Sequence, residues 1–179
     1  MEDLDLFNNQ TFEESKRFLE KAKKEESDEG IQAYLKASII LSHSFLEGQI
    51  NSITSDFEGS GHLSMLEQSV FFEKEVVLKK GKFQLGSTKF YRTDERIEFL
   101  IKKFKPQLDF KSETWWTRLK SQIKIRNSLV HPRKNVRLKT ADCERSLECC
   151  LEAVNRVYLA VYNMSFPYAS MNYDSSLEF

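Results

Sequence analysis

The chain has 179 residues, of which 40% are apolar and 14 are Phe, so it holds enough apolar bulk for one domain with its own core. Only 6 Gly and 3 Pro occur, which argues against a loop-rich or disordered chain. No apolar run approaches the roughly 20 residues that span a bilayer, and the acidic N-terminus lacks the apolar segment of a signal peptide. We therefore expect a cytoplasmic protein without a membrane contact.

The zero net charge hides an uneven distribution of charge along the chain. Residues 1–73 hold 6 Lys/Arg against 15 Asp/Glu, residues 74–139 hold 19 against 6, and residues 140–179 hold 2 against 6. A basic block of this kind is typical of a surface that binds a phosphate backbone. Pairing of the same block with the acidic N-terminal third inside the fold is an equally good interpretation.

The cysteines argue against both a disulfide framework and a zinc site. There are three of them, Cys143, Cys149 and Cys150, and two are adjacent in the sequence. Their number is odd, and no spacing of Cys or His matches a structural zinc motif. We therefore expect buried thiols in a helix, and neither a metal nor another cofactor.

Helical periodicity dominates the first half of the chain. Thr11 and Glu14 form the pattern of a capping box, which predicts a first helix over about residues 11–27, with a break at Gly30. A second helix over about residues 31–57 has a broad apolar face, which indicates a central helix packed on several neighbours. A second capping box at Ser64 predicts a helix over about residues 64–80.

In the second half, residues 79–93 are the least helical segment. Two glycines, β-branched residues and aromatic residues predict a loop or short hairpin there, which we interpret as solvated although its basic and aromatic side chains suit RNA. Capping residues and prolines predict further helices from Thr93 to Phe104, from Ser112 to His131 and from Thr140 to about Met164.

The predicted elements together describe an all-α protein. We expect a helical bundle of about five or six helices in a single domain over residues 1–179, with its core in about residues 10–165. The remaining residues, 166–179, are predicted to form an irregular C-terminal tail.

The most distinctive segment is Arg126-Asn127-Ser128-Leu129-Val130-His131, at the end of a predicted helix and directly before Pro132. On a helical wheel, Arg126 falls in the middle of an apolar stripe that consists of Trp115, Trp116, Leu119, Ile123 and Val130. Burial of an unpaired charge is costly. Arg126 is therefore expected to point into a shared polar pocket, to pair with a buried carboxylate, or to lie where a partner chain covers the stripe.

This segment resembles the motif of the HEPN superfamily. In that motif an Arg is followed by a polar residue, and a His lies four to six positions after the Arg near a helix end in an all-α domain. Residues 42–53, SHSFLEGQINSI, also resemble the preceding HEPN helix, in which a Glu often lies on an apolar face. The resemblance covers roughly residues 10–165 in helix order, and only the six-residue motif is specific.

The resemblance implies a metal-independent endoribonuclease whose active site lies at the interface of a symmetric homodimer. His131 would abstract the proton of the ribose 2′-OH or protonate the leaving 5′-oxygen, and Arg126 would hold the phosphate. Asn127, which is one helical turn before His131, would orient the imidazole or the phosphate. The products would be a 2′,3′-cyclic phosphate and a 5′-hydroxyl.

Further residues are candidates for supporting roles. Glu47 either reaches Arg126 across the bundle or forms a local pair with His43, which lies one turn earlier on the same predicted helix. Basic residues after the motif are candidate contacts to the RNA backbone, namely Arg133, Lys134 and Arg137. Trp115 and Trp116 suit base stacking, but their spacing favours the core.

Two classes of function follow from these patterns. The first is a homodimeric RNase that acts on RNA as a toxin or another defence component, with an antitoxin or a nucleotidyltransferase as a possible partner. Some HEPN toxins carry a modified Tyr two residues after the His, whereas this chain has Arg133 there, which argues against that regulation. The second is a non-catalytic helical interaction or nucleotide-binding module, in which Arg126 is a structural cation and His131 a helix cap.

Overall fold

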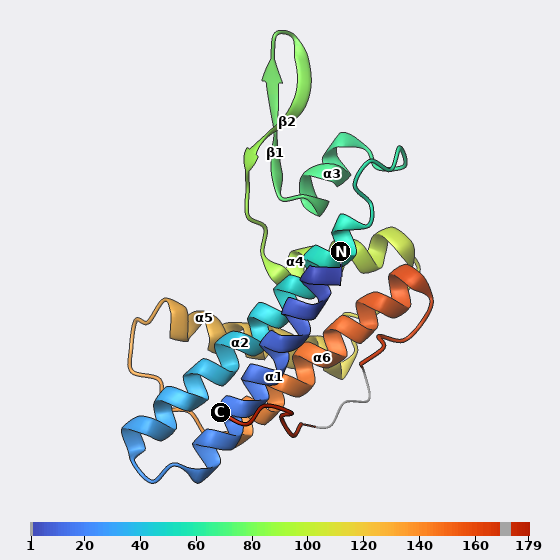
Figure 1. The fold of residues 1–179 in the computed structure, drawn as a ribbon. Coiled ribbons are helices and arrows are strands. Elements are labelled where there is room, and N and C mark those ends of the chain that lie inside the picture. The colour runs from blue at the N-terminus through green and yellow to red at the C-terminus, as the bar shows by residue number, and fades with distance from the viewer. Residues whose placement is uncertain (1, 169–172) are drawn as a thin grey trace.

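Helices joined by short loops, with one β-hairpin, make up the computed structural model, which describes residues 2–168 and 173–179 (Figure 1). Within those residues there are six helices and two strands. In chain order they are α1 (Glu2–Lys24), α2 (Asp28–Ser55), α3 (Met65–Phe71), β1 (Lys74–Lys79), β2 (Lys82–Thr88), α4 (Thr93–Phe104), α5 (Thr114–Val130) and α6 (Thr140–Tyr162). The protein is thus mostly helical, as predicted. The prediction of an all-α fold is wrong in one respect, because the chain also forms a β-hairpin.

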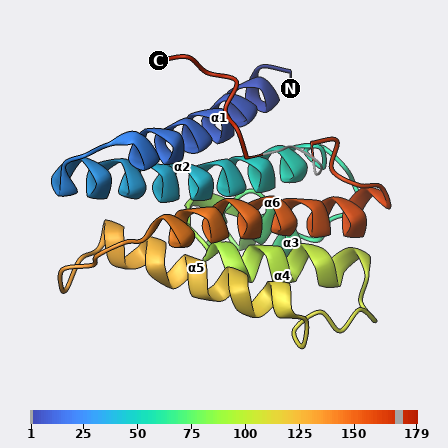
Figure 2. The same ribbon diagram turned by 90° about the horizontal axis from the view of Figure 1, so that it is seen from below.

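The long helices are stacked in layers around a single core. Helices α1 and α2 pack against each other along their length, α6 lies against α2, and α4 and α5 cover the other side of α6 (Figure 2). Each of these helices contributes fully buried side chains to the core, for example Phe12, Leu46, Leu100, Leu119 and Val154. Burial of one such side chain stabilises the fold by roughly 1.5–3 kcal/mol. The broad apolar face of residues 31–57 predicts a central helix packed on several neighbours, and α2 is packed in this way.

The first helix begins earlier than the sequence pattern predicts. Thr11 is not a cap, because it lies inside α1 and its Oγ1 donates a hydrogen bond to the Phe7 carbonyl, 2.9 Å away. The break between α1 and α2 also falls before Gly30, which is in the first turn of α2. Ser27 caps that turn, and its Oγ accepts a hydrogen bond from the Gly30 N–H at 3.2 Å.

The second capping box is confirmed, but the helix that it opens is short. Ser64 and Glu67 exchange hydrogen bonds between side chain and backbone, as the pattern predicts. The helix then ends at Phe71, and Glu73 adopts a left-handed φ of 50° that turns the chain into β1. The predicted helix over residues 64–80 is therefore wrong in its second half, where strand pairing overrides the local pattern.

A two-residue turn closes the hairpin. Lys80 and Gly81 both have positive φ, 51° and 75°, which is the geometry of the turn that suits the twist of antiparallel strands. Lys79 therefore pairs with Lys82, and the strands continue to the pairing of Lys74 with Thr88. The hairpin projects away from the helical layers (Figure 1). It starts before the predicted segment 79–93 and ends within it.

The last three helices agree with the prediction to within a few residues. α4 begins at Thr93, α6 begins at Thr140, and α5 ends where His131 precedes Pro132. The N-cap of α5 is Glu113 and not Ser112.

Two described parts of the C-terminal segment contact the bundle. Within the predicted tail, Phe166 is buried, and Ser175 and Ser176 hydrogen-bond to Glu13 of α1, while residues 169–172 lie outside the described residues. No helix in the described ranges combines the length and apolarity needed to cross a membrane. The three cysteines are buried and free in α6, where burial raises the pKa of Cys149 to about 11.

Candidate functional site

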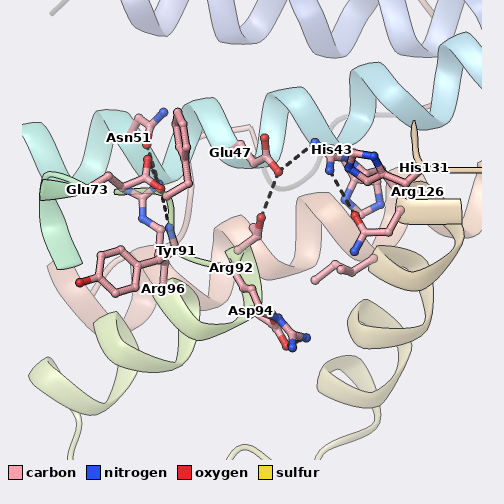
Figure 3. Close-up of a pocket in the computed structure, with 14 residues that line it drawn as sticks. His43, Glu47, Asn51, Glu73, Tyr91, Arg92, Asp94, Arg96, Arg126 and His131 are labelled. Carbon is pink, nitrogen blue, oxygen red and sulfur yellow. Dashed lines mark hydrogen bonds and ion pairs between the residues drawn. The ribbon is translucent and has the colours of Figure 1, made fainter. Parts of the chain in front are cut away.

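An open cleft of about 600 Å³ lies at the side of the bundle where the hairpin joins α4 (Figure 3). Its walls come from four segments that are distant in the sequence: α2, Glu73 directly before β1, residues 90–96 from the linker into the first turn of α4, and residues 123–131 at the end of α5. The polar groups in the cleft include Arg126, Asn127 and His131, so the structure brings all three residues of the sequence motif to one place.

The path of α5 explains why Arg126 lies in the cleft. The first three turns of α5 bury the predicted apolar stripe, from Trp115 to Ile123, within this subunit. In the last turn, Leu129 is only partly buried against the core and Val130 is exposed. Arg126 lies at this transition, where its side chain is partly buried and its guanidinium reaches polar groups. The prediction that Trp115 and Trp116 belong to the core is confirmed.

The predicted contact between Glu47 and Arg126 is present. Nη2 of Arg126 lies 3.3 Å from Oε1 of Glu47, and Nη1 donates to Oδ1 of Asn127 at 3.2 Å. Glu47 also accepts a hydrogen bond from Oγ1 of Thr93 at 3.0 Å, so one carboxylate links α2, α4 and α5. The side chains of Arg126 and Glu47 are 25% and 39% exposed, which places this ion pair at the cleft surface and not in the core.

His43 contributes a second imidazole to the cleft. It lies one helical turn before Glu47 on α2 and is only 2% exposed, and its Nε2 has no hydrogen-bond partner among the described residues. Burial, followed by the nearby charge of Arg126, lowers the pKa of His43 from 6.5 to about 3. His43 is therefore neutral at neutral pH. The alternative pairing of Glu47 with His43 is absent from the described hydrogen bonds and ion pairs.

His131 occupies the exposed end of the motif. Its backbone N–H donates to the Asn127 carbonyl at 2.9 Å and so caps α5, and its side chain is exposed. It lines both the cleft and an adjoining shallow hollow, in which Arg133 and Lys134 also lie. Two of the three residues that were predicted to contact the RNA backbone, Arg133 and Lys134, are therefore next to the motif.

Arg137 lies elsewhere. Its guanidinium forms an ion pair with Asp28 at the start of α2, and it lines neither the cleft nor the adjoining hollow. Other cations of the basic block also pair with the acidic N-terminal third, as shown by the contacts of Arg96 with Glu73 and of Lys103 with Glu67. Part of the basic block thus balances charge inside the fold, while Arg133 and Lys134 stay on the surface beside the cleft.

The sequence pattern did not single out Arg96, the most buried cation of the cleft. Its Nη1 lies 2.7 Å from Oδ1 of Asn51 and 3.2 Å from Oε2 of Glu73, and its Nη2 donates to the Phe71 carbonyl. Burial lowers its pKa, and the charges of Glu73 and Glu47 act in the opposite direction. One signal was available, because Arg96 precedes Leu100 by four residues and so shares the apolar face of its helix, as Arg126 does in α5.

Comparison of the chain with protein-family models, with curated proteins and with solved structures found no match. Among the described residues, no three His, Cys, Asp or Glu side chains cluster in a way that would hold a metal ion. The groups that the cleft offers include two imidazoles, two amides, carboxylates and guanidinium groups, which suit proton transfer and the binding of an anion such as phosphate.

Proposed function

We propose that this protein is a metal-independent endoribonuclease of the HEPN type that cleaves RNA at a composite site in a homodimer. The observation that carries the proposal is that Arg126, Asn127 and His131 line one open cleft. Within it, Arg126 is only partly neutralised by a half-exposed carboxylate. A guanidinium that still faces solvent beside an exposed imidazole suits the recognition of a phosphodiester.

In the proposed reaction, His131 removes the proton of a ribose 2′-OH, and the 2′-oxygen attacks the adjacent phosphorus. The bond from phosphorus to the 5′-oxygen breaks. The leaving oxygen takes up a proton from the imidazolium form of His131 in the other subunit. Arg126 offsets the charge that develops on the phosphoryl oxygens. The products are a 2′,3′-cyclic phosphate and a 5′-hydroxyl, and no electrons are exchanged.

The dimeric form of this proposal places the second subunit at the exposed end of α5. Val130 and His131 are both exposed there, so a second copy of the helix would cover both. A symmetric contact of this kind brings two copies of the motif together. Such a protein fits a toxin or another defence component, whose partner would be an antitoxin.

Two observations favour a second candidate, a non-catalytic helical interaction or nucleotide-binding module. Arg126 already has a carboxylate partner, Glu47, within its own subunit, and His131 caps α5 through its backbone. Both residues would then have structural roles. The two candidates differ in whether removal of either side chain changes RNA cleavage without loss of the fold.

The test is RNA cleavage in EDTA by the wild type, Arg126→Ala and His131→Ala. We expect cleavage that survives chelation and falls by about 100-fold or more in either variant. His62→Ala is the matched control, because His62 is an exposed histidine in the turn after α2 and lines neither hollow. Equal cleavage by the wild type and both motif variants would exclude this active site.

A further inference from the structure

The linker between β2 and α4 holds an aromatic ring at the edge of the cleft. Phe90 is 84% exposed, the highest exposure of any large apolar side chain in the described part of the chain. A single exposed apolar residue is common on protein surfaces and by itself carries no meaning. Phe90, however, lines the same cleft as Arg126 and His131.

The backbone on both sides of Phe90 is anchored. The N–H of Lys89 donates to the Glu73 carbonyl at 2.8 Å, and the N–H of Tyr91 donates to Oε1 of Glu73 at 3.2 Å. The Tyr91 hydroxyl is also hydrogen-bonded to Oγ of Ser69, at 2.8 Å. The ring of Phe90 is therefore presented to solvent from a fixed segment, which lowers the entropic cost of binding a planar group against it.

The hairpin and the linker that carry Phe90 are basic. Residues 74–92, which are the hairpin and the linker, contain six Lys/Arg against one Glu, a net charge of +5. Nζ of Lys89 lies 4.8 Å from the centre of the Tyr91 ring, and the side chain of Arg92, which forms an ion pair with Asp94, is exposed at the cleft. Aromatic rings among cations are the features with which proteins bind single-stranded nucleic acid, through base stacking and phosphate contacts.

We propose that Phe90 stacks on an unpaired base of the RNA, so that the substrate class is single-stranded RNA or an unpaired loop. This inference rests on the proposed function, because the phosphate of the same strand would lie at Arg126 in the same cleft. The cleft volume of about 600 Å³ is in the range of a site for one small ligand. In a duplex, both faces of a base are already covered by its neighbours, so duplex RNA does not offer the base that Phe90 needs.

The test is the binding of a fluorescently labelled 2′-O-methyl oligonucleotide, which lacks the attacking hydroxyl and so separates binding from cleavage. We expect Phe90→Ala to raise the Kd for the single strand by about tenfold, which is typical for loss of one base–aromatic stack. Phe90→Tyr should bind within about twofold of the wild type. Phe83→Ala is the matched control, since Phe83 is 66% exposed on the same basic hairpin but does not line the cleft.

Fluorescence of an introduced indole reports stacking directly. Phe90→Trp should lose emission when the single strand is added, because a stacked base quenches the indole, and should keep it when the duplex is added. Phe83→Trp should show little quenching with either form. Size measurement of Phe90→Ala is part of the same experiment, since loss of a dimer in this variant would show that Phe90 packs against a second copy and would overturn the inference.

Two other results would overturn it: unchanged affinity of Phe90→Ala for the single strand, or an equal loss in Phe83→Ala. The proposed function is tested separately from the base-binding site. Binding that depends on Phe90, with cleavage that does not depend on His131, supports the base-binding site and refutes the RNase. Cleavage that depends on His131, with binding that does not depend on Phe90, supports the RNase and refutes the base-binding site.

Discussion

Mild acid should destabilise this protein through His43. The side chain is buried beside Arg126, and its pKa in the folded protein is lowered to about 3, from 6.5. In the unfolded chain, His43 takes up a proton as the pH falls below the ordinary pKa of 6.5. In the folded protein, His43 stays neutral at the same pH. The free energy of unfolding is therefore greatest above the ordinary pKa and decreases as the pH falls towards the lowered one.

The size of this loss follows from the two pKa values. Each pH unit between them costs about 1.4 kcal/mol, and the loss between pH 7 and pH 5 is about 2 kcal/mol. Between these two pH values, the free energy of unfolding should decrease by about 2 kcal/mol more in the wild type than in His43→Gln. The Gln side chain is neutral in both the folded and the unfolded state. Urea unfolding at the two pH values, followed by the fluorescence of the buried Trp115 and Trp116, measures the difference.

Two controls separate His43 from other titrating groups. Carboxylates are the same in both proteins and cancel in the comparison. His62→Gln, which removes an exposed histidine, should show the wild-type loss. Arg126→Gln should keep most of the loss, because burial is the larger cause of the lowered pKa. A loss in His43→Gln as large as that of the wild type would refute the assignment of a neutral, buried His43.

Three further predictions concern the cleft. If two subunits share a site that needs both His131 side chains, equal mixing with inactive His131→Ala should lower RNase activity to about a quarter of that of the same total amount of wild type, whereas a site within one subunit would keep about half. Glu47→Gln should reduce cleavage by about tenfold or more through misplacement of Arg126, while urea unfolding changes by less than about 1 kcal/mol because the ion pair is half-exposed. In a plot of log affinity for RNA against log salt, Arg133→Ala should reduce the slope by about one, whereas Arg137→Ala, whose side chain pairs with Asp28, should not. Equal slopes for both variants would contradict this division.

The sequence predicts best those elements whose signals are local. The capping box at Ser64, the start of α4 at Thr93 and the end of α5 before Pro132 are all present in the structure. Each depends on residues within one helical turn, because capping and proline geometry act on the adjacent backbone. The Arg-Asn-x3-His motif belongs to the same class, since its position at the end of α5 follows from Pro132, which stops the helix directly after it.

Contacts between segments distant in the sequence determine the helix boundaries that the local patterns did not predict. Helix α1 extends back through polar residues because it packs on α2, where a side chain at Gly48 would place its Cβ 2.2 Å from Oδ1 of Asn8. Helix α3 stops at Phe71 because the following residues pair with β2. Neither partner can be identified from the local pattern, since each contact depends on residues brought together by the fold.

The same distinction applies to the candidate site. The sequence by itself determined a helix end that carries Arg126 and His131, with Glu47 as one of two possible partners. Only the tertiary structure placed the buried, neutral His43 and the exposed Phe90 on the same cleft. The physical reason is that the cleft is built from four segments far apart in the chain, and the burial that sets the protonation of His43 is a property of the packed bundle.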